Sequence, residues 1–308
     1  MKVLVNGATG LIGRHLCRSL AAQGHTVAAV SRSVSRPDGL AVAEIHQWDP
    51  QSGPVPRAAF AGVDAVVNLA GEPIDARRWT DEQKRRIRDS RVITTTNIVE
   101  GLRTADSKPE VFVSGSAVGF YGDRGDEELD ESSGPGRGFM SELCEQWERE
   151  AARVNELGIR VVQIRTGVVL SLEGGALKKM IAPFKLGVGG TLGSGKQWFP
   201  WIHIDDIAGI CHHAILTASL QGPVNGVAPH SVTNAEFTRE LARALHRPAF
   251  LPVPQMAMKV LIGEMSEVLF GSQRVLPKTA LASGYKFRHA TLAEALADLL
   301  GKSKRAHG

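Results

Sequence analysis

Cysteine, aromatic residues and long apolar runs are all scarce in this 308-residue chain. The three cysteines, Cys17, Cys144 and Cys211, lie far apart, so their spacing indicates neither a disulfide framework nor a metal site. No stretch approaches the roughly 20 apolar residues that a membrane span needs, and the first residues lack the pattern of a signal peptide. We therefore expect no membrane association and a reducing, cytoplasmic setting in which the thiols are buried.

The chain also lacks a concentrated basic patch, although its net charge is +4. The densest basic runs, residues 77–91 and 302–305, are not interleaved with aromatic residues, as a nucleic-acid surface would be. A solvated basic face, or attraction for a phosphorylated small molecule, explains the charge. We expect no nucleic-acid partner, and the sequence leaves a homodimer open.

Short apolar runs alternate with amphipathic segments through the first half of the chain, in a composition that is 43% hydrophobic. This alternation predicts an α/β fold with a doubly wound parallel sheet. The predicted strands are 2–6, 26–31, 43–48, 65–69, 111–114 and 160–164, and the predicted helices are 11–23, 81–104 and 142–157.

The second half has fewer strand signals and many glycines between residues 174 and 195, which predicts loops there. Helices are expected at 205–217, 234–245, 256–269 and 292–300, the last one capped by Thr291 with Glu294 three residues on. Three prolines between Arg247 and Pro254 indicate a linker. We expect a nucleotide-binding domain over 1–225, with its sheet core at about 1–170, and a small C-terminal domain over 248–298.

A glycine-rich turn, VLVNGATGLIG, joins the first strand to the first helix. Glycines in this setting permit a sharp turn, backbone approach to a pyrophosphate and close packing of the helix, whose N-terminus faces the anion. The turn predicts a Rossmann dinucleotide site contacted by Gly7, Thr9, Gly10, Leu11, Ile12 and Gly13.

The second strand ends with Ser31 and Arg32, where an NAD-binding protein carries a carboxylate for the ribose hydroxyls. An arginine beside hydroxyl groups suits a 2′-phosphate instead. The cofactor predicted here is therefore NADP(H), with a surface arginine as the alternative interpretation. Leu69, Ala70 and Gly71 follow the fourth strand and are expected along the same crevice.

Ser116 follows the fifth strand, and Tyr121 lies five residues further on. A serine hydroxyl beside a nicotinamide can orient a substrate oxygen, and a phenol can exchange a proton with it. Both are predicted catalytic residues, although Tyr121 could instead be a packing residue. In the segment WIHIDD, we expect His203 to be oriented inside the fold and both aspartates to cap the following helix.

Together these residues resemble the extended short-chain dehydrogenase/reductase superfamily of the NAD-dependent epimerase/dehydratase type. The segments NLAGEPI, SGSAVGFYGD and WIHIDDIA are similar to those of a narrower group, the epimerase family proteins that have a C-terminal domain of unassigned function. The resemblance spans the chain. It implies NADP(H) bound by Ser31 and Arg32, by Leu69 and Ala70, by Arg91, and by the backbone around Val169.

The chain departs from the superfamily at the Tyr-x-x-x-Lys pair, whose positions hold Gly138 and Glu142. One hypothesis is an atypical NADP(H)-dependent oxidoreductase or epimerase acting on a small molecule, with Tyr121 or a substrate-bound water handling the proton. The alternative is a catalytically silent NADPH-binding sensor or regulatory protein.

Overall fold

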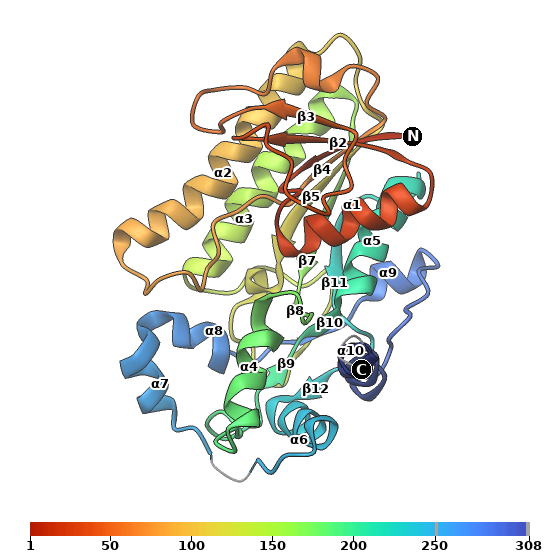
Figure 1. Cartoon of the computed structure of the whole chain (residues 1–308). Coiled ribbons are helices and arrows are strands. Elements are labelled where there is room, and N and C mark those ends of the chain that lie inside the picture. Colours follow the sequence, from red (N-terminus) through yellow and green to blue (C-terminus); the bar gives the residue numbers. More distant parts are fainter. Residues whose placement is uncertain (250–251, 306–308) are drawn as a thin grey trace.

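A computed structural model describes residues 1–249 and 252–305 and contains a central parallel sheet (Figure 1). Its seven strands run in the order β11-β7-β5-β4-β1-β2-β3, and every neighbouring pair is parallel. The strands are β1 (Lys2–Asn6), β2 (Thr26–Ser31), β3 (Glu44–Gln47), β4 (Ala65–Asn68), β5 (Val111–Ala117), β7 (Arg160–Thr166) and β11 (Gly222–Gly226). The order reverses beside β1, which confirms the doubly wound α/β fold.

Helices cover both faces of the sheet (Figure 1). They are α1 (Leu11–Ala22) and α5 (Ile204–Leu216) on one face, and α2 (Asp81–Thr104) and α3 (Phe139–Ala152) on the other. Successive residues of β1 belong to opposite cores: Val3 and Val5 pack in the cluster that includes Leu16 of α1, and Leu4 packs in the cluster that includes Ile98 of α2. Because both of their faces are buried, central strands such as β1 and β4 carry continuous apolar runs rather than an alternating pattern.

The remaining elements form a smaller lobe at the carboxyl edge of the sheet (Figure 1). Three small strand pairs belong to it: β8 (Val168–Leu170) with β10 (Trp201–His203), β9 (Trp198–Phe199) with β12 (Val232–Thr233), and β6 (Glu128–Leu129) with β13 (Arg274–Val275). Its helices are α4 (Gly175–Lys185), α6 (Asn234–Leu245), α7 (Gln255–Ile262), α8 (Ser266–Phe270), α9 (Lys278–Ala282) and α10 (Leu292–Arg305). Short 3₁₀ turns occupy Arg57–Phe60, Val118–Tyr121, Arg153–Leu157 and Gly263–Met265.

Several predicted boundaries were wrong, each for a local reason. The helix expected over 256–269 is broken at Gly263, whose φ of +66° is incompatible with a continuous α-helix. The glycine-rich segment contains α4 despite the internal Pro183. The sheet extends to β11, whose sequence GPVNG carries no strand pattern and which forms an edge. The predicted linker includes residues 250 and 251, which lie outside the described residues.

The predicted N-cap of α10 is confirmed. The Thr291 amide donates to the Glu294 carboxylate at 3.2 Å, and the Glu294 amide donates to the Thr291 hydroxyl at 3.4 Å. These reciprocal bonds form a capping box. Within residues 1–249 and 252–305, no helix is both long and apolar enough to cross a bilayer.

Candidate dinucleotide site

The glycine turn between β1 and α1 has the geometry that its sequence predicts. Gly7 adopts a φ of +85°, and its carbonyl accepts a hydrogen bond from the Gly10 amide at 3.0 Å. A Cβ on Gly13 would lie 2.1 Å from the Gly7 carbonyl oxygen, which no side chain tolerates. The helix therefore packs directly on the turn, and its N-terminus is held at the carboxyl edge of the sheet.

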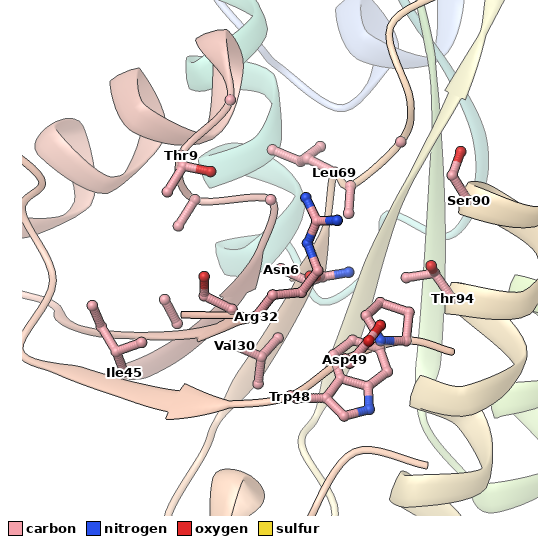
Figure 2. A pocket seen from close by; sticks show the side chains of 18 of the residues that line it. Asn6, Thr9, Val30, Arg32, Ile45, Trp48, Asp49, Leu69, Ser90 and Thr94 are labelled. Atoms are coloured by element: carbon pink, nitrogen blue, oxygen red, sulfur yellow. The ribbon is translucent and has the colours of Figure 1, made fainter. Parts of the chain in front are cut away.

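A cavity of about 380 Å³ opens beside this turn (Figure 2). It lies where the ends of β1, β2 and β4 meet, which is the crevice where doubly wound sheets bind ligands. Of the residues predicted to contact a cofactor, those that line it are Gly7, Thr9, Gly10, Ser31, Arg32, Leu69, Ala70 and Gly71. Glu72 and Pro73 continue its wall.

Five residues of the predicted set are not among those that line the cavity. Leu11 and Ile12 pack against the hydrophobic core in the first turn of α1, and Gly13 lies behind Gly7. Val169 lies on β8, where it pairs with Ile202. Arg91 lies on α2, with its guanidinium directly behind Gly71.

Arg91 and Ser90 fasten the loop after β4 to helix α2. The Arg91 guanidinium donates to the Glu72 carbonyl at 3.0 Å, and the Glu72 amide donates to the Ser90 hydroxyl at 2.9 Å. Burial lowers the pKa of Arg91 from its ordinary value, although nearby Cys144 and Glu72 oppose that shift. A Cβ on Gly71 would lie 2.8 Å from the Arg91 guanidinium carbon, so a side chain at this position would displace the guanidinium.

Arg32 is exposed and lies directly after β2, and in Figure 2 its side chain extends into the cavity. The guanidinium is therefore available to a ligand at the end of the cavity formed by β2 and β3. Asp49 also lines this end, next to Trp48. A cationic group, backbone amides at a helix start and a turn with no room for side chains suit a phosphorylated dinucleotide.

Sequence analysis missed part of the cavity wall. Trp48, Asp49, Pro50 and Gln51 directly follow β3, and Ser90 and Thr94 lie one turn apart on α2. The position of residues 48–51 after a predicted strand was the available signal. Ser90 and Thr94 had none, because a long helix does not show which of its polar residues face a ligand.

A buried chain of amides and hydroxyls supports the floor of the site. Asn6 donates to Asn68 at 2.8 Å, and Asn68 donates to the Thr95 hydroxyl at 2.9 Å, which also accepts from Trp147 at 3.0 Å. These bonds connect β1, β4, α2 and α3. They fix the relative positions of the strand ends that form the cavity.

Ser116 is the second-last residue of strand β5 rather than a residue after it, and it is buried, with 4% of its surface accessible. Its hydroxyl donates to the Glu148 carboxylate at 2.6 Å. Glu148 is in turn held by Arg165, whose Nε and second terminal nitrogen lie 2.8 Å and 2.9 Å from its two oxygens. Burial alone would lower the pKa of Arg165, but its bonds to Glu148 raise it overall.

Tyr121 is fully buried at the other end of this network. Its hydroxyl lies 2.7 Å from the Asn225 side-chain oxygen and 3.0 Å from the Asp130 carbonyl, and it accepts from Arg165 at 3.0 Å. Burial raises the pKa of Tyr121 despite the opposing effect of Arg165. This placement favours the packing interpretation, and a proton-transfer role for Tyr121 stays a prediction.

The positions of the absent tyrosine and lysine hold no substitute acid–base pair. Gly138 is the N-cap of α3 with a φ of +96°, and a Cβ there would meet no atom of the described residues within 4 Å. Glu142 is exposed on the same helix.

His203 is buried, as expected, and its Nδ1 accepts the Asp205 amide at 3.0 Å, so the histidine itself caps α5. The expectation that Asp206 caps this helix was wrong. The Asp206 carboxylate accepts the amides of Arg288 and His289 at 2.8 and 3.0 Å. It therefore anchors the segment before α10 to the start of α5.

The parallel sheet, the glycine turn and the cavity define a dinucleotide-binding protein of the doubly wound class. Residues 3–226 match the family model described as "NAD dependent epimerase/dehydratase family", and residues 253–299 match a domain of unknown function, DUF1731. The chain belongs to the NAD-dependent epimerase/dehydratase family, which confirms the resemblance that its motifs indicated.

Individual relatives match over nearly the whole chain. It is 40% identical over 304 residues to the human epimerase family protein SDR39U1, covering 97% of this chain and all of the relative. It is 36% identical over 305 residues to Bacillus subtilis YfhF, covering 99% of both. A crystal structure of human SDR39U1 isoform 2 with NADPH matches with a TM-score of 0.88 and 39% identity, over 98% of this chain and 99% of that one.

Proposed function

We propose that this chain binds NADP(H) in the cavity beside the glycine turn and acts as an atypical oxidoreductase or epimerase on a small molecule. The observation that carries the proposal is the cavity itself, which combines the start of α1 with Arg32 at the end of β2. The crystal structure of human SDR39U1 contains NADPH, which supports the same cofactor for this chain.

The preference for NADP(H) over NAD(H) follows from the residues at the end of β2. Arg32 and Ser31 line the cavity there and offer a guanidinium fork and a hydroxyl to a 2′-phosphate. Asp49 lies on the following strand end and is exposed, so the site is not uniformly cationic. We assign the 2′-phosphate to Arg32, because its guanidinium supplies the attractive charge.

In this function the chain positions the cofactor and the substrate. When bound, the nicotinamide supplies hydride-transfer chemistry. Gly7 and Gly10 hold the backbone close to the pyrophosphate, and Ser90 and Arg91 keep the Gly71–Glu72 loop in place. Ser116 would orient a substrate oxygen after its hydroxyl leaves Glu148.

Proton transfer through the buried network from Tyr121 to Ser116 is not part of the proposal. The two residues are connected through Arg165, and a guanidinium does not lose its proton in proteins. Tyr121 could act only in direct contact with substrate. A water bound beside the substrate satisfies the proton requirement without breaking the Tyr121 hydrogen bonds.

A second function, a catalytically silent NADPH sensor, is favoured by one specific observation. Both candidate catalytic hydroxyls, on Ser116 and Tyr121, are buried and bonded to protein groups. In that case cofactor occupancy, rather than turnover, would be the signal.

Two measurements test the proposal in sequence. Titration calorimetry with NADPH and NADH should show tighter binding of NADPH, and equal affinities would contradict the assignment of the 2′-phosphate site. A screen of carbonyl and alcohol metabolites, followed by nicotinamide absorbance, should then find a substrate that is turned over. NADPH binding without turnover of any compound would favour the sensor function.

A further inference from the structure

Four side chains of types that can ligate a metal meet away from the dinucleotide cavity, where the segment of the C-terminal helix contacts the start of α5. His203 and Asp205 lie at the start of α5, His289 lies in the segment before α10, and Asp298 lies on α10. Each offers a nitrogen or oxygen atom, and these four atoms all lie within 4.8 Å of one another. Two imidazoles and two carboxylates form a nitrogen and oxygen donor set of the kind that zinc takes.

A second observation points to a ligand at this cluster. His203 is 1% exposed, and its Nε2 has no hydrogen-bond partner among the residues that the structure describes. That nitrogen lies 3.4 Å from the Asp298 carboxylate, which is long for a hydrogen bond. Two atoms that ligate one tetrahedral zinc at about 2.0–2.1 Å are themselves about 3.3 Å apart. The separation therefore fits two ligands of one ion.

We propose that this cluster is a zinc site in which His203 Nε2, His289 and Asp298 are the ligands and a water completes the coordination. The three ligands are unequally accessible: the His203 side chain is fully buried, whereas those of His289 and Asp298 are 14% and 24% exposed. The partly open side gives an ion access and leaves room for the water.

Asp205 would support the ligands from outside the coordination sphere. One of its oxygens lies 2.8 Å from His15 Nε2, which orients the carboxylate. Its other oxygen lies 3.9 Å from His203 Nδ1. Carboxylates commonly accept the second ring proton of a zinc-binding histidine, which fixes the tautomer and the ring orientation.

Metal binding would require His203 to change its tautomer. In the chain without metal, Nδ1 accepts the Asp205 amide, so the proton of the neutral ring resides on Nε2. Zinc takes the place of the proton on Nε2. The proton moves to Nδ1, from which the ring donates to the Asp205 carboxylate. One helix-capping hydrogen bond is lost and three metal–ligand bonds form.

The proposed ion would fasten the C-terminal lobe to the nucleotide-binding domain. His203 ends β10 and begins α5, whereas His289 and Asp298 belong to the segment that carries α10. The rings of His203 and His289 already contact each other, with centroids 3.8 Å apart. Zinc would therefore stabilise the docked position of α10.

The test uses the full chain, stripped with a chelator and titrated with ZnCl₂. We expect one zinc per chain by elemental analysis and a higher unfolding temperature with zinc. His289→Gln combined with Asp298→Asn should weaken binding at least a hundredfold. Asp205→Asn should weaken it about 10- to 100-fold, the range for outer-shell partners.

His212→Gln is the matched control, because His212 and His25 form another histidine pair whose Nε2 atoms are 2.9 Å apart. It should leave zinc affinity unchanged. Absence of stoichiometric zinc, loss of zinc only in the His212 variant, or a double variant that binds within threefold of the parent would overturn the proposal.

Should the double variant not fold, X-ray absorption of the cobalt-substituted parent chain decides the question. A first shell of nitrogen and oxygen with two imidazoles supports the site. One imidazole or none overturns it.

Discussion

The Glu148–Arg165 ion pair is buried between the two predicted catalytic residues. The two side chains are only 10% and 5% exposed, and they connect Ser116 with Tyr121. The Arg165 guanidinium also lies 3.5 Å from the centre of the Phe120 ring. Such a pair is costly to break, because removing one charge leaves the other buried without compensation.

Glu148→Gln should lower the free energy of unfolding by about 3–5 kcal/mol, the range for breaking a buried pair. Urea denaturation measures the change. Glu145→Gln on the same helix is the control: Glu145 pairs with Arg149 at 3.7 Å on the surface, with both side chains more than half exposed. That control should change stability by less than about 1 kcal/mol. Equal effects would mean that the buried pair contributes no more than a surface one.

Ser116→Ala and Tyr121→Phe should have different effects once a substrate is found. Loss of the Ser116 hydroxyl should reduce kcat/KM, because that group would orient the substrate oxygen. Tyr121→Phe should lower the free energy of unfolding by about 1–3 kcal/mol, because buried partners lose a hydrogen bond, and should leave turnover within about threefold. General acid–base groups contribute about 10²–10⁴-fold, so a loss of that size in Tyr121→Phe would establish the phenol as the acid.

At the scale of elements, the junction of β1, the glycine turn and α1 determines where the cofactor cavity forms. The strand and helix meet so closely that a Cβ on Gly13 would clash with the backbone of Gly7 and Ala8. The contact is between backbone atoms, so no rotamer change can relieve a clash there.

Gly13→Ala should therefore displace α1, lower the free energy of unfolding by about 1–3 kcal/mol or more and weaken NADPH binding. Thermal denaturation and calorimetry measure the two effects. Gly134→Ala is the control, since a Cβ at Gly134 would meet nothing within 4 Å in the part of the chain that the structure describes. A Gly13 variant that binds NADPH like the Gly134 variant would show that the close packing is not required.

The elements of the sheet were predictable from sequence, whereas those of the smaller lobe were largely not. Residues 3–5 of β1 are apolar because both faces of the sheet are covered. Polar residues mark both ends of helix α2, so its bounds could be read from the sequence. The lobe uses two-residue strands and helices interrupted by glycine or proline, such as α4. Their stability comes from tertiary contacts, which a local pattern does not contain.

The residues of the candidate site were likewise predictable only in part. The glycine turn, Arg32 and the residues after β4 were predictable, because doubly wound sheets place strand ends along one crevice. The partners of Ser116 and Tyr121 were not. Glu148 and Arg165 lie on a helix and a strand distant in sequence, and nothing local indicates that their side chains meet.

At the scale of the whole molecule, all three cysteines are buried in the packed cores. Burial raises the pKa of Cys17, Cys144 and Cys211 to about 12. At pH 8 the folded chain should thus hold very little thiolate, which is the reactive form.

Ellman's reagent at pH 8 should find no fast-reacting thiol in the folded protein. It should find three per chain after guanidinium unfolding, where the pKa of a thiol is about 8.5. Their exposure consequently reports global unfolding. Rapid labelling of one cysteine in the folded state would show that its core opens locally.

The central claim for the whole molecule is that the cavity binds NADP(H) through Arg32. The most direct test is calorimetry of Arg32→Ala with NADPH and NADH, with Arg36→Ala as the control. Arg36 is exposed nearby, and its guanidinium donates to the Ala43 carbonyl.

Losing a charged hydrogen-bonded pair removes about 1.5–3 kcal/mol, and 1.4 kcal/mol is about tenfold in affinity. We predict that Arg32→Ala weakens NADPH binding at least tenfold and leaves NADH binding nearly unchanged, whereas Arg36→Ala alters neither. An equal loss for both cofactors, or no loss for either, would contradict the account.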